Sequence, residues 1–268
     1  MPATRPVRYS PMTAMRTESG VVAALLVAAG FAWWSTADRM AGMNAGPGTA
    51  LGSVGSFAGV WATMMAAMML PSLSPAAADF ATSVRRELSR VVLFAGGYLL
   101  VWSATGIAAY GVFELGKSLF ANSLAWHGGG HWLVAGVLVL AAFYQLTPLK
   151  RAFLIRCRSP LRLLDASRRS SRREALAIGL RSGSWCLGCT WALMAALFAL
   201  GVMSLAWMAL IAVLVALEKV GPWHRGARLV TAGVLVVLAA AILAAPHDVP
   251  GFVVPGSPTS PQTMRAMG

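Results

Sequence analysis

The chain has 268 residues, of which 57% are hydrophobic and only 12% are charged. That charged share is about half that of an average soluble protein, and the mean hydropathy is +0.67. So few charges cannot cover the surface of a soluble globule of this size. Composition therefore excludes a water-soluble enzyme, a disordered chain and a collagen-like fibre, and it predicts an all-α, polytopic transmembrane helical bundle.

Uncharged stretches long enough to cross a bilayer, at about 20 residues each, recur along the chain. Pro71 and Pro75 are expected to close the second span, and Pro148 the fourth. A transmembrane helical domain is predicted for residues 20–245, between a basic cytoplasmic tail at 1–19 and a disordered, Pro-rich extracytoplasmic tail at 246–268. Its seven predicted spans are residues 20–36, 54–71, 91–113, 132–147, 183–201, 204–218 and 229–245.

Basic residues orient this bundle, because Lys and Arg near span ends are retained on the cytoplasmic side. With the N-terminus inside and the C-terminus outside, the inner segments carry 19 of the 22 basic residues. The outer segments hold only Arg39, Lys117 and Arg265. An alternative for the first span is a signal peptide cleaved near Ala37, which would leave six spans; bulky Trp33 and Trp34 beside that site disfavour it.

The net charge of +13 does not predict a nucleic-acid partner, since the basic residues follow the topology and no soluble domain presents them. Nine of them lie between Lys150 and Arg173. We expect this inner loop to lie against anionic lipid of the inner leaflet.

Three cysteines occur, and all three map to the predicted inner side of the membrane. Cys157 lies in the basic loop, and Cys186 and Cys189 lie at the inner end of the fifth span. The cytosol keeps thiols reduced and the number is odd, so free thiols are expected. Positions i and i+3 share a helix face, so Cys186 and Cys189 can converge on one soft cation.

The second span ends at the same inner boundary with a run of methionines. Met65, Met68 and Met69 have i, i+3, i+4 spacing and form one thioether stripe on a helix. Thiolates and thioethers together are the ligands that select Cu(I). A methionine stripe alone is more typical of packing, but beside a cysteine pair it predicts a soft-metal site.

Polar residues also gather at this boundary. Tyr144 and Gln145 end the fourth span, where interhelical hydrogen bonding is the favoured interpretation. Glu218 and Lys219 end the sixth span, where they are expected to reach the interface as an ion pair.

Several motifs together resemble a bacterial family of integral membrane proteins described as predicted metal-binding. They are Met64 to Pro71, the run from Tyr144 to Lys150, Cys157 to Pro160, Cys186 to Trp191 with Met194, and Gly201 to Met203. The resemblance covers about residues 54–218, and it implies a multi-span helical protein with a cysteine-based metal site but no established reaction. Where that family often has further cysteines, this chain has Phe153 and Thr190.

These observations favour a non-enzymatic protein of the bacterial inner membrane that binds or handles Cu(I) through Cys186, Cys189 and Cys157 with Met68, Met69 and Met65. A metal-carrying partner protein is compatible with this interpretation. Two alternatives remain: a membrane thiol-redox relay using Cys186 and Cys189, and a structural or assembly scaffold without chemistry.

Overall fold

The computed structural model describes residues 11–40, 54–84, 87–120, 130–158, 171–201, 204–220 and 224–244, and every regular element within them is a helix. This confirms the all-α class. The eight helices are α1 (Pro11–Met40), α2 (Val54–Ser83), α3 (Leu88–Phe120), α4 (Gly130–Leu146), α5 (Pro148–Arg158), α6 (Arg172–Leu200), α7 (Leu205–Val220) and α8 (His224–Ala244). Both predicted tails lie mostly outside the described residues, although α1 begins nine residues before the predicted start of the first span.

Five of these helices, α1, α2, α3, α6 and α8, contain segments long and apolar enough to cross a membrane. A sixth span results if α4 and α5, which meet at an angle of 68°, are counted as one bent crossing. Helix α7 has 16 residues, somewhat fewer than the roughly 20 that a full crossing needs. The helices are thus compatible with a multi-pass membrane protein, while the count of seven and the orientation stay predictions.

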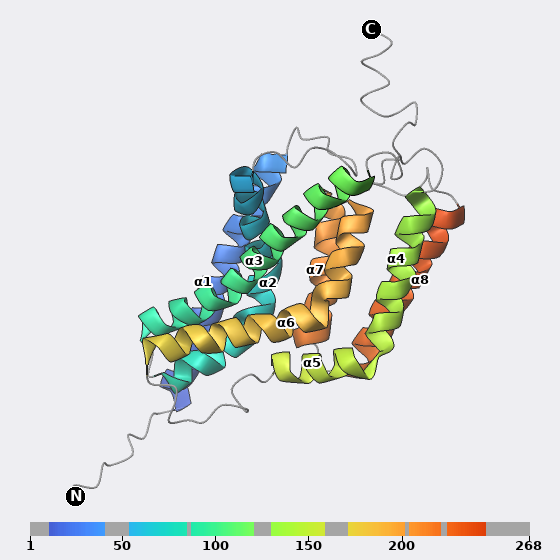
Figure 1. Cartoon of the computed structure of the whole chain (residues 1–268). Helices are drawn as coiled ribbons and strands as arrows, with labels where there is room; N and C mark the ends of the chain where they lie inside the picture. Colours follow the sequence, from blue (N-terminus) through green and yellow to red (C-terminus); the bar gives the residue numbers. More distant parts are fainter. Residues whose placement is uncertain are drawn as a thin grey trace, which may run out of the picture.

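Helix α6 occupies the centre of the packing, because it contacts α3, α4, α5 and α7. Helices α4 and α8 stand side by side, and α1 lies along α2 (Figure 1). The α3–α6 contact is close enough to require glycine: a Cβ at Gly97 would lie 2.6 Å from the carbonyl oxygen of Leu176, and one at Gly179 would meet the carbonyl of Phe94. Small residues bring helix backbones together in this way in membrane bundles.

Helix α2 does not end at its prolines, so the expectation that Pro71 and Pro75 close this helix is wrong. It continues through Pro71 and Pro75 to Ser83. Pro75 has no N–H to donate to the carbonyl of Pro71, and the hydroxyl of Ser74 donates to that carbonyl instead, at 2.8 Å. Neighbouring hydroxyls that satisfy freed carbonyls are a usual reason why membrane helices tolerate proline.

The basic loop predicted after the fourth span begins with a helix. Helix α4 ends at Leu146, close to the predicted boundary, and Pro148 then starts α5, where its missing N–H costs nothing. The Thr147 hydroxyl accepts a hydrogen bond from the backbone N–H of Lys150 at 3.3 Å and so caps the new helix. Figure 1 shows α5 running across one end of the bundle.

Helix α6 begins at Arg172, eleven residues before the predicted fifth span. Ser171 and Glu174 form a capping box there, in which the serine side chain accepts from the Glu174 N–H at 3.2 Å and the Glu174 carboxylate accepts from the Ser171 N–H at 3.3 Å. This reciprocal pair satisfies two amide groups that the first turn leaves free. The first turns of α6 therefore extend beyond the uncharged stretch.

Candidate metal centre

The three cysteines of the chain come together between α5 and α6. Their sulfur atoms all lie within 4.8 Å of one another, and all three thiols are free, as the sequence predicts. Cys186 and Cys189 are buried, with exposed fractions of 0% and 1%, and Cys157 is half-buried. The i, i+3 spacing on α6 brings two of the sulfurs together, and the turn into α5 adds the third.

Local hydrogen bonds orient this thiol cluster, which consists of Cys157, Cys186 and Cys189. The Cys189 thiol donates to the carbonyl oxygen of Cys186 at 3.2 Å, and the Thr190 hydroxyl donates to the same carbonyl at 2.8 Å. Hydroxyls and thiols commonly bond back to the preceding helical turn in this way. The helix backbone thus fixes where the two sulfurs of α6 lie.

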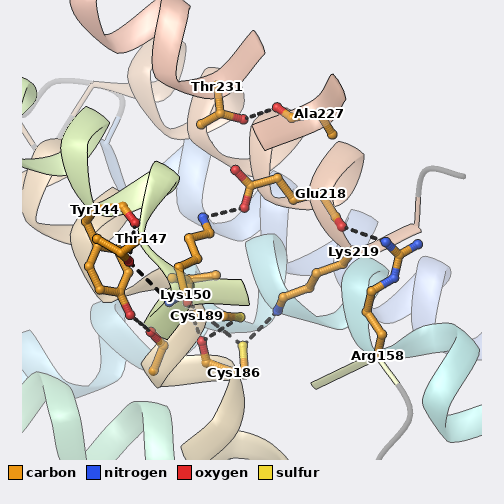
Figure 2. A network of polar contacts seen from close by, with 12 residues as sticks. Tyr144, Thr147, Lys150, Arg158, Cys186, Cys189, Glu218, Lys219, Ala227 and Thr231 are labelled. Carbon is orange, nitrogen blue, oxygen red and sulfur yellow. Dashed lines mark hydrogen bonds and ion pairs between the residues drawn. The ribbon is translucent and has the colours of Figure 1, made fainter. Parts of the chain in front are cut away.

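A buried lysine lies against the cluster. The Nζ of Lys219, on α7, is 2.7 Å from the Cys186 sulfur (Figure 2) and 3.2 Å from the hydroxyl of Ser72 on α2. The phenol oxygen of Tyr98, on α3, is 2.8 Å from the same sulfur and 3.5 Å from the lysine. Four helices, α2, α3, α6 and α7, therefore meet at the ammonium group of Lys219.

The expected surface ion pair between Glu218 and Lys219 does not form. Both side chains are buried, and adjacent residues of a helix point in different directions. Glu218 pairs instead with Lys150 of α5, at 2.5 Å, and the two side chains are 1% and 0% exposed. Because low-polarity surroundings make an unpaired charge costly, each of these residues finds a partner on another helix.

Further contacts hold α5 against α6 and α7. Arg158 donates to the carbonyl oxygen of Glu218 at 3.2 Å, as Figure 2 shows. A Cβ at Gly188 would lie 2.6 Å from the ring of Phe153, so the absent side chain makes room for the aromatic ring of α5. Tyr144 donates to the Gly188 carbonyl at 2.6 Å, which is the interhelical bond expected of it. The neighbouring Gln145 is fully buried, and its amide has no partner among the described residues.

The predicted thioether residues lie on the side of α2 that faces this region. Met65, Met68 and Met69 are buried in the same core as Cys186. They share a helix face with Ser72, which contacts Lys219, because their separations of three, four and seven residues return to one side of a helix. Along α2, Met68 and Met69 lie roughly 5–6 Å from Ser72 and Met65 about 10 Å from it. Their role as metal ligands stays a prediction.

Charge balance distinguishes the two buried lysines. Lys150 and Glu218 neutralise one another. In the part of the chain that the structure describes, Lys219 is surrounded by a thiol and two hydroxyl groups and forms no ion pair with a carboxylate. Its positive charge is available to balance negative charge on the neighbouring sulfurs, which thiolates carry when they bind a metal.

The fold and this site are those of an all-helical protein, compatible with a multi-pass membrane protein, in which three thiols meet beside a buried lysine. A family model described as "PpoB2: Copper chaperone" matches residues 58–242. The chain therefore belongs to the PpoB2 copper chaperone family. This supports the expected metal-related family, while the individual motifs stay predictions. No curated protein and no solved structure matches the chain.

Proposed function

We propose that this protein is a non-enzymatic copper-handling protein of the bacterial inner membrane, which binds Cu(I) as cargo at the thiol cluster. The observation that carries the proposal is the convergence of three free thiols, two of them buried, whose sulfurs lie within 4.8 Å of one another. Membership of a copper chaperone family supports it. Soft thiolate ligands select Cu(I) over the hard cations that prefer oxygen.

The spacing of the sulfurs suits a three-coordinate ion. A point between three atoms spaced in this way is at most about 2.8 Å from each, and metal–thiolate bonds are about 2.3 Å long, as in zinc sites. Inward shifts of about 0.5 Å per side chain would therefore close the site. Met68 and Met69 are the nearest of the predicted thioethers along α2 and would provide further soft ligands.

Lys219 supports this assignment through charge. A Cu(I) ion with two thiolates carries one net negative charge, and one with three thiolates carries two. An anionic complex buried among apolar helices is costly unless a cation lies next to it. The ammonium group of Lys219, 2.7 Å from the Cys186 sulfur, balances one of these charges.

We place the site at the cytoplasmic end of the bundle, where the charge pattern puts the inner segments. There the basic segment 150–173 would lie on anionic lipid, and a metal-carrying partner protein could reach Cys157, the least buried of the three thiols. On the cytoplasmic side the thiols stay reduced, and a metal-carrying partner there could deliver Cu(I) to them.

Copper analysis tests the proposal. Protein purified in detergent under reducing conditions is loaded with Cu(I), passed over a desalting column and assayed for copper per chain. We expect about one tightly held equivalent, and we expect the double variant Cys186→Ser/Cys189→Ser to lose it. Ser184→Ala, an exposed position on α6, is the matched control and should keep the metal.

Unchanged copper content in the double variant would remove the proposal. Alkylation trapping after mild oxidation tests the redox alternative in the same preparations. A reversible disulfide between Cys186 and Cys189 that forms with copper present, together with low copper affinity, would favour a thiol relay instead.

A further inference from the structure

Methionines are unevenly distributed among the helices. Helices α3, α4, α5 and α8 contain none. Helix α1 contains three, close to its two ends. Six more occur on α2, α6 and α7, and all six are at most 6% exposed: Met64, Met65, Met68, Met69, Met194 and Met208. The three helices that contain these methionines also supply Ser72, Cys186 and Lys219.

One contact through α7 and one direct contact give the relative direction of α2 and α6. At the thiol end, Ser72 of α2 and Cys186 of α6 both contact the Nζ of Lys219. Further along, the rings of Trp61 and Phe198 stack with centroids 5.3 Å apart. The intervals between the two contacts are eleven residues on α2 and twelve on α6, about 16–18 Å of helix each. The two helices therefore run antiparallel and in step over this length.

On each helix, one buried methionine lies between these two contacts and one turn from the stacked rings. Met65 is four residues from Trp61, and Met194 is four residues from Phe198. Residues four apart are neighbours on one helix face, so both side chains lie on the side that carries the stacked rings. Each is displaced along its helix toward the thiol cluster by about 6 Å. The two thioethers thus occupy the same level of the bundle.

Helix α7 brings a third thioether to this region. Met208 precedes Lys219 by eleven residues, which is close to three full turns, so the two share a face of α7. It is fully buried, and α7 packs against both α2 and α6. Met208 lies about 16 Å along α7 from Lys219, near the level of the stacked rings. Met68 and Met69 lie at intermediate depth on α2.

We propose that Met65, Met194 and Met208 form a second soft-metal site, the thioether site, about 10–16 Å deeper in the bundle than the thiol cluster. It takes a monovalent soft cation, Cu(I) or Ag(I), and receives it from the thiol cluster past Met68 and Met69. The transfer exchanges one set of sulfur ligands for another, and the ion stays monovalent throughout. As a route for the cargo, the thioether site rests on the proposed function; as a binding site it does not.

The chemistry of the two sites gives them different roles. Thioethers are neutral, so an ion bound by them keeps its positive charge in apolar surroundings, whereas thiolates neutralise it. The thioether site should therefore bind more weakly than the thiol cluster. A relay requires binding that is favourable enough for entry and weak enough for exit. If the protein stored the ion instead, we would expect the deeper of the two sites to bind it more tightly than the thiol cluster.

Silver binding without the thiols tests the site directly. The triple variant Cys157→Ser/Cys186→Ser/Cys189→Ser is titrated with Ag(I), which is not redox-active under these conditions, and bound silver is counted per chain. We expect about one weakly held equivalent to remain. Adding Met65→Leu, Met194→Leu and Met208→Leu should remove it, whereas the matched control Leu197→Ile in the same thiol-free background should keep it. If the thiol-free chain binds no silver, or if the leucine variant keeps it, the thioether site is wrong.

A second variant keeps the thiols and so separates the two proposals. In the chain with only the three Met→Leu changes, the tight equivalent should remain and the weaker one should be lost. Loss of both equivalents, with the fold intact by circular dichroism, would contradict independent sites. If the thiol-free chain instead binds as much silver as the wild type, the proposed function fails while the thioether site stands.

Transfer is measured in proteoliposomes that contain a silver-sensitive dye. We expect Ag(I) entry with the wild-type protein and at least a tenfold slower entry with the three Met→Leu changes. Equal rates would overturn the relay, and the thioether site would then hold the ion without passing it on.

Discussion

Two carboxylates in this protein each join helices, and they differ mainly in burial. Glu218 of α7 pairs with Lys150 of α5 at 2.5 Å, with 1% and 0% of the side chains exposed. Glu87, just before α3, pairs with Arg90 at 2.6 Å, with 40% and 22% exposed, and lies 3.8 Å from Arg172 of α6. The charges and distances are similar, but the surroundings are not.

Burial decides what each pair can do. In water-accessible surroundings an ion pair gains little, because solvent screens the charges and the side chains lose freedom. In a buried site the pair is expensive to form and more expensive to break, because the remaining charge has no partner. The Lys150–Glu218 pair therefore holds α5, and Cys157 with it, against the rest of the thiol cluster. The Glu87 pair lies at the start of α3 and positions none of the cysteines.

Breaking the buried pair should have the largest effect. Glu218→Gln keeps the shape of the side chain and leaves the Lys150 charge buried without a partner. We expect a loss of about 3–5 kcal/mol in the free energy of unfolding, measured as a lower melting temperature in detergent. The copper bound by this variant should show fewer sulfur ligands by X-ray absorption, because Cys157 is no longer held in place.

Removing both charges is the control for that experiment. The double variant Lys150→Met/Glu218→Gln leaves no buried unpaired charge, and it should recover much of the lost stability. If the double variant is no more stable than Glu218→Gln, the pair does not owe its effect to the uncompensated lysine.

A side chain at Gly188 should separate α5 from α6. The Cβ of Gly188→Ala would lie 2.6 Å from the Phe153 ring, which is too close without movement. We expect a cost of about 1–3 kcal/mol, as for other overpacked sites. Phe153→Leu in the same chain should restore part of the stability and of the copper affinity. Failure of this rescue would mean that the ring is not what the new methyl group meets.

Part of this arrangement follows from sequence, and the reasons are local. The spans follow from runs of apolar residues, and the convergence of Cys186 with Cys189 follows from helical spacing alone. The capping box of Ser171 and Glu174 corresponds to the pattern Ser-x-x-Glu in the sequence, which is typical of a helix start. This pattern predicts the observed beginning of α6.

Other parts depend on contacts between distant residues. Cys157 joins the cluster because the chain turns at Thr147 into α5, and eleven residues with four basic side chains do not by themselves indicate a packed helix. Lys219 reaches Cys186, Tyr98 and Ser72, which are 33, 121 and 147 positions away. Residue spacing within one helix does not predict contacts between helices. Sequence analysis therefore placed Lys219 at the membrane interface.

Removing the Lys219 charge should affect copper more than folding. Lys219→Met keeps the length of the buried chain but takes away the group that balances the metal–thiolate complex. We expect about a tenfold weaker Cu(I) affinity, equal to about 1.4 kcal/mol, in competition with a Cu(I) chelator. Lys219→Arg restores the charge and should recover part of the affinity. An unchanged affinity in Lys219→Met would show that the ammonium group does not stabilise the bound ion.

The exposed pair should give the smallest effect and complete the comparison. Glu87→Gln removes the carboxylate charge near Arg90 and Arg172, and both arginines remain accessible to water, where their charge is solvated. We expect a change below about 1 kcal/mol in stability, reduced further at high salt because exposed charges are screened, and no change in copper content. A loss as large as that of Glu218→Gln would mean that burial is not what separates the two carboxylates.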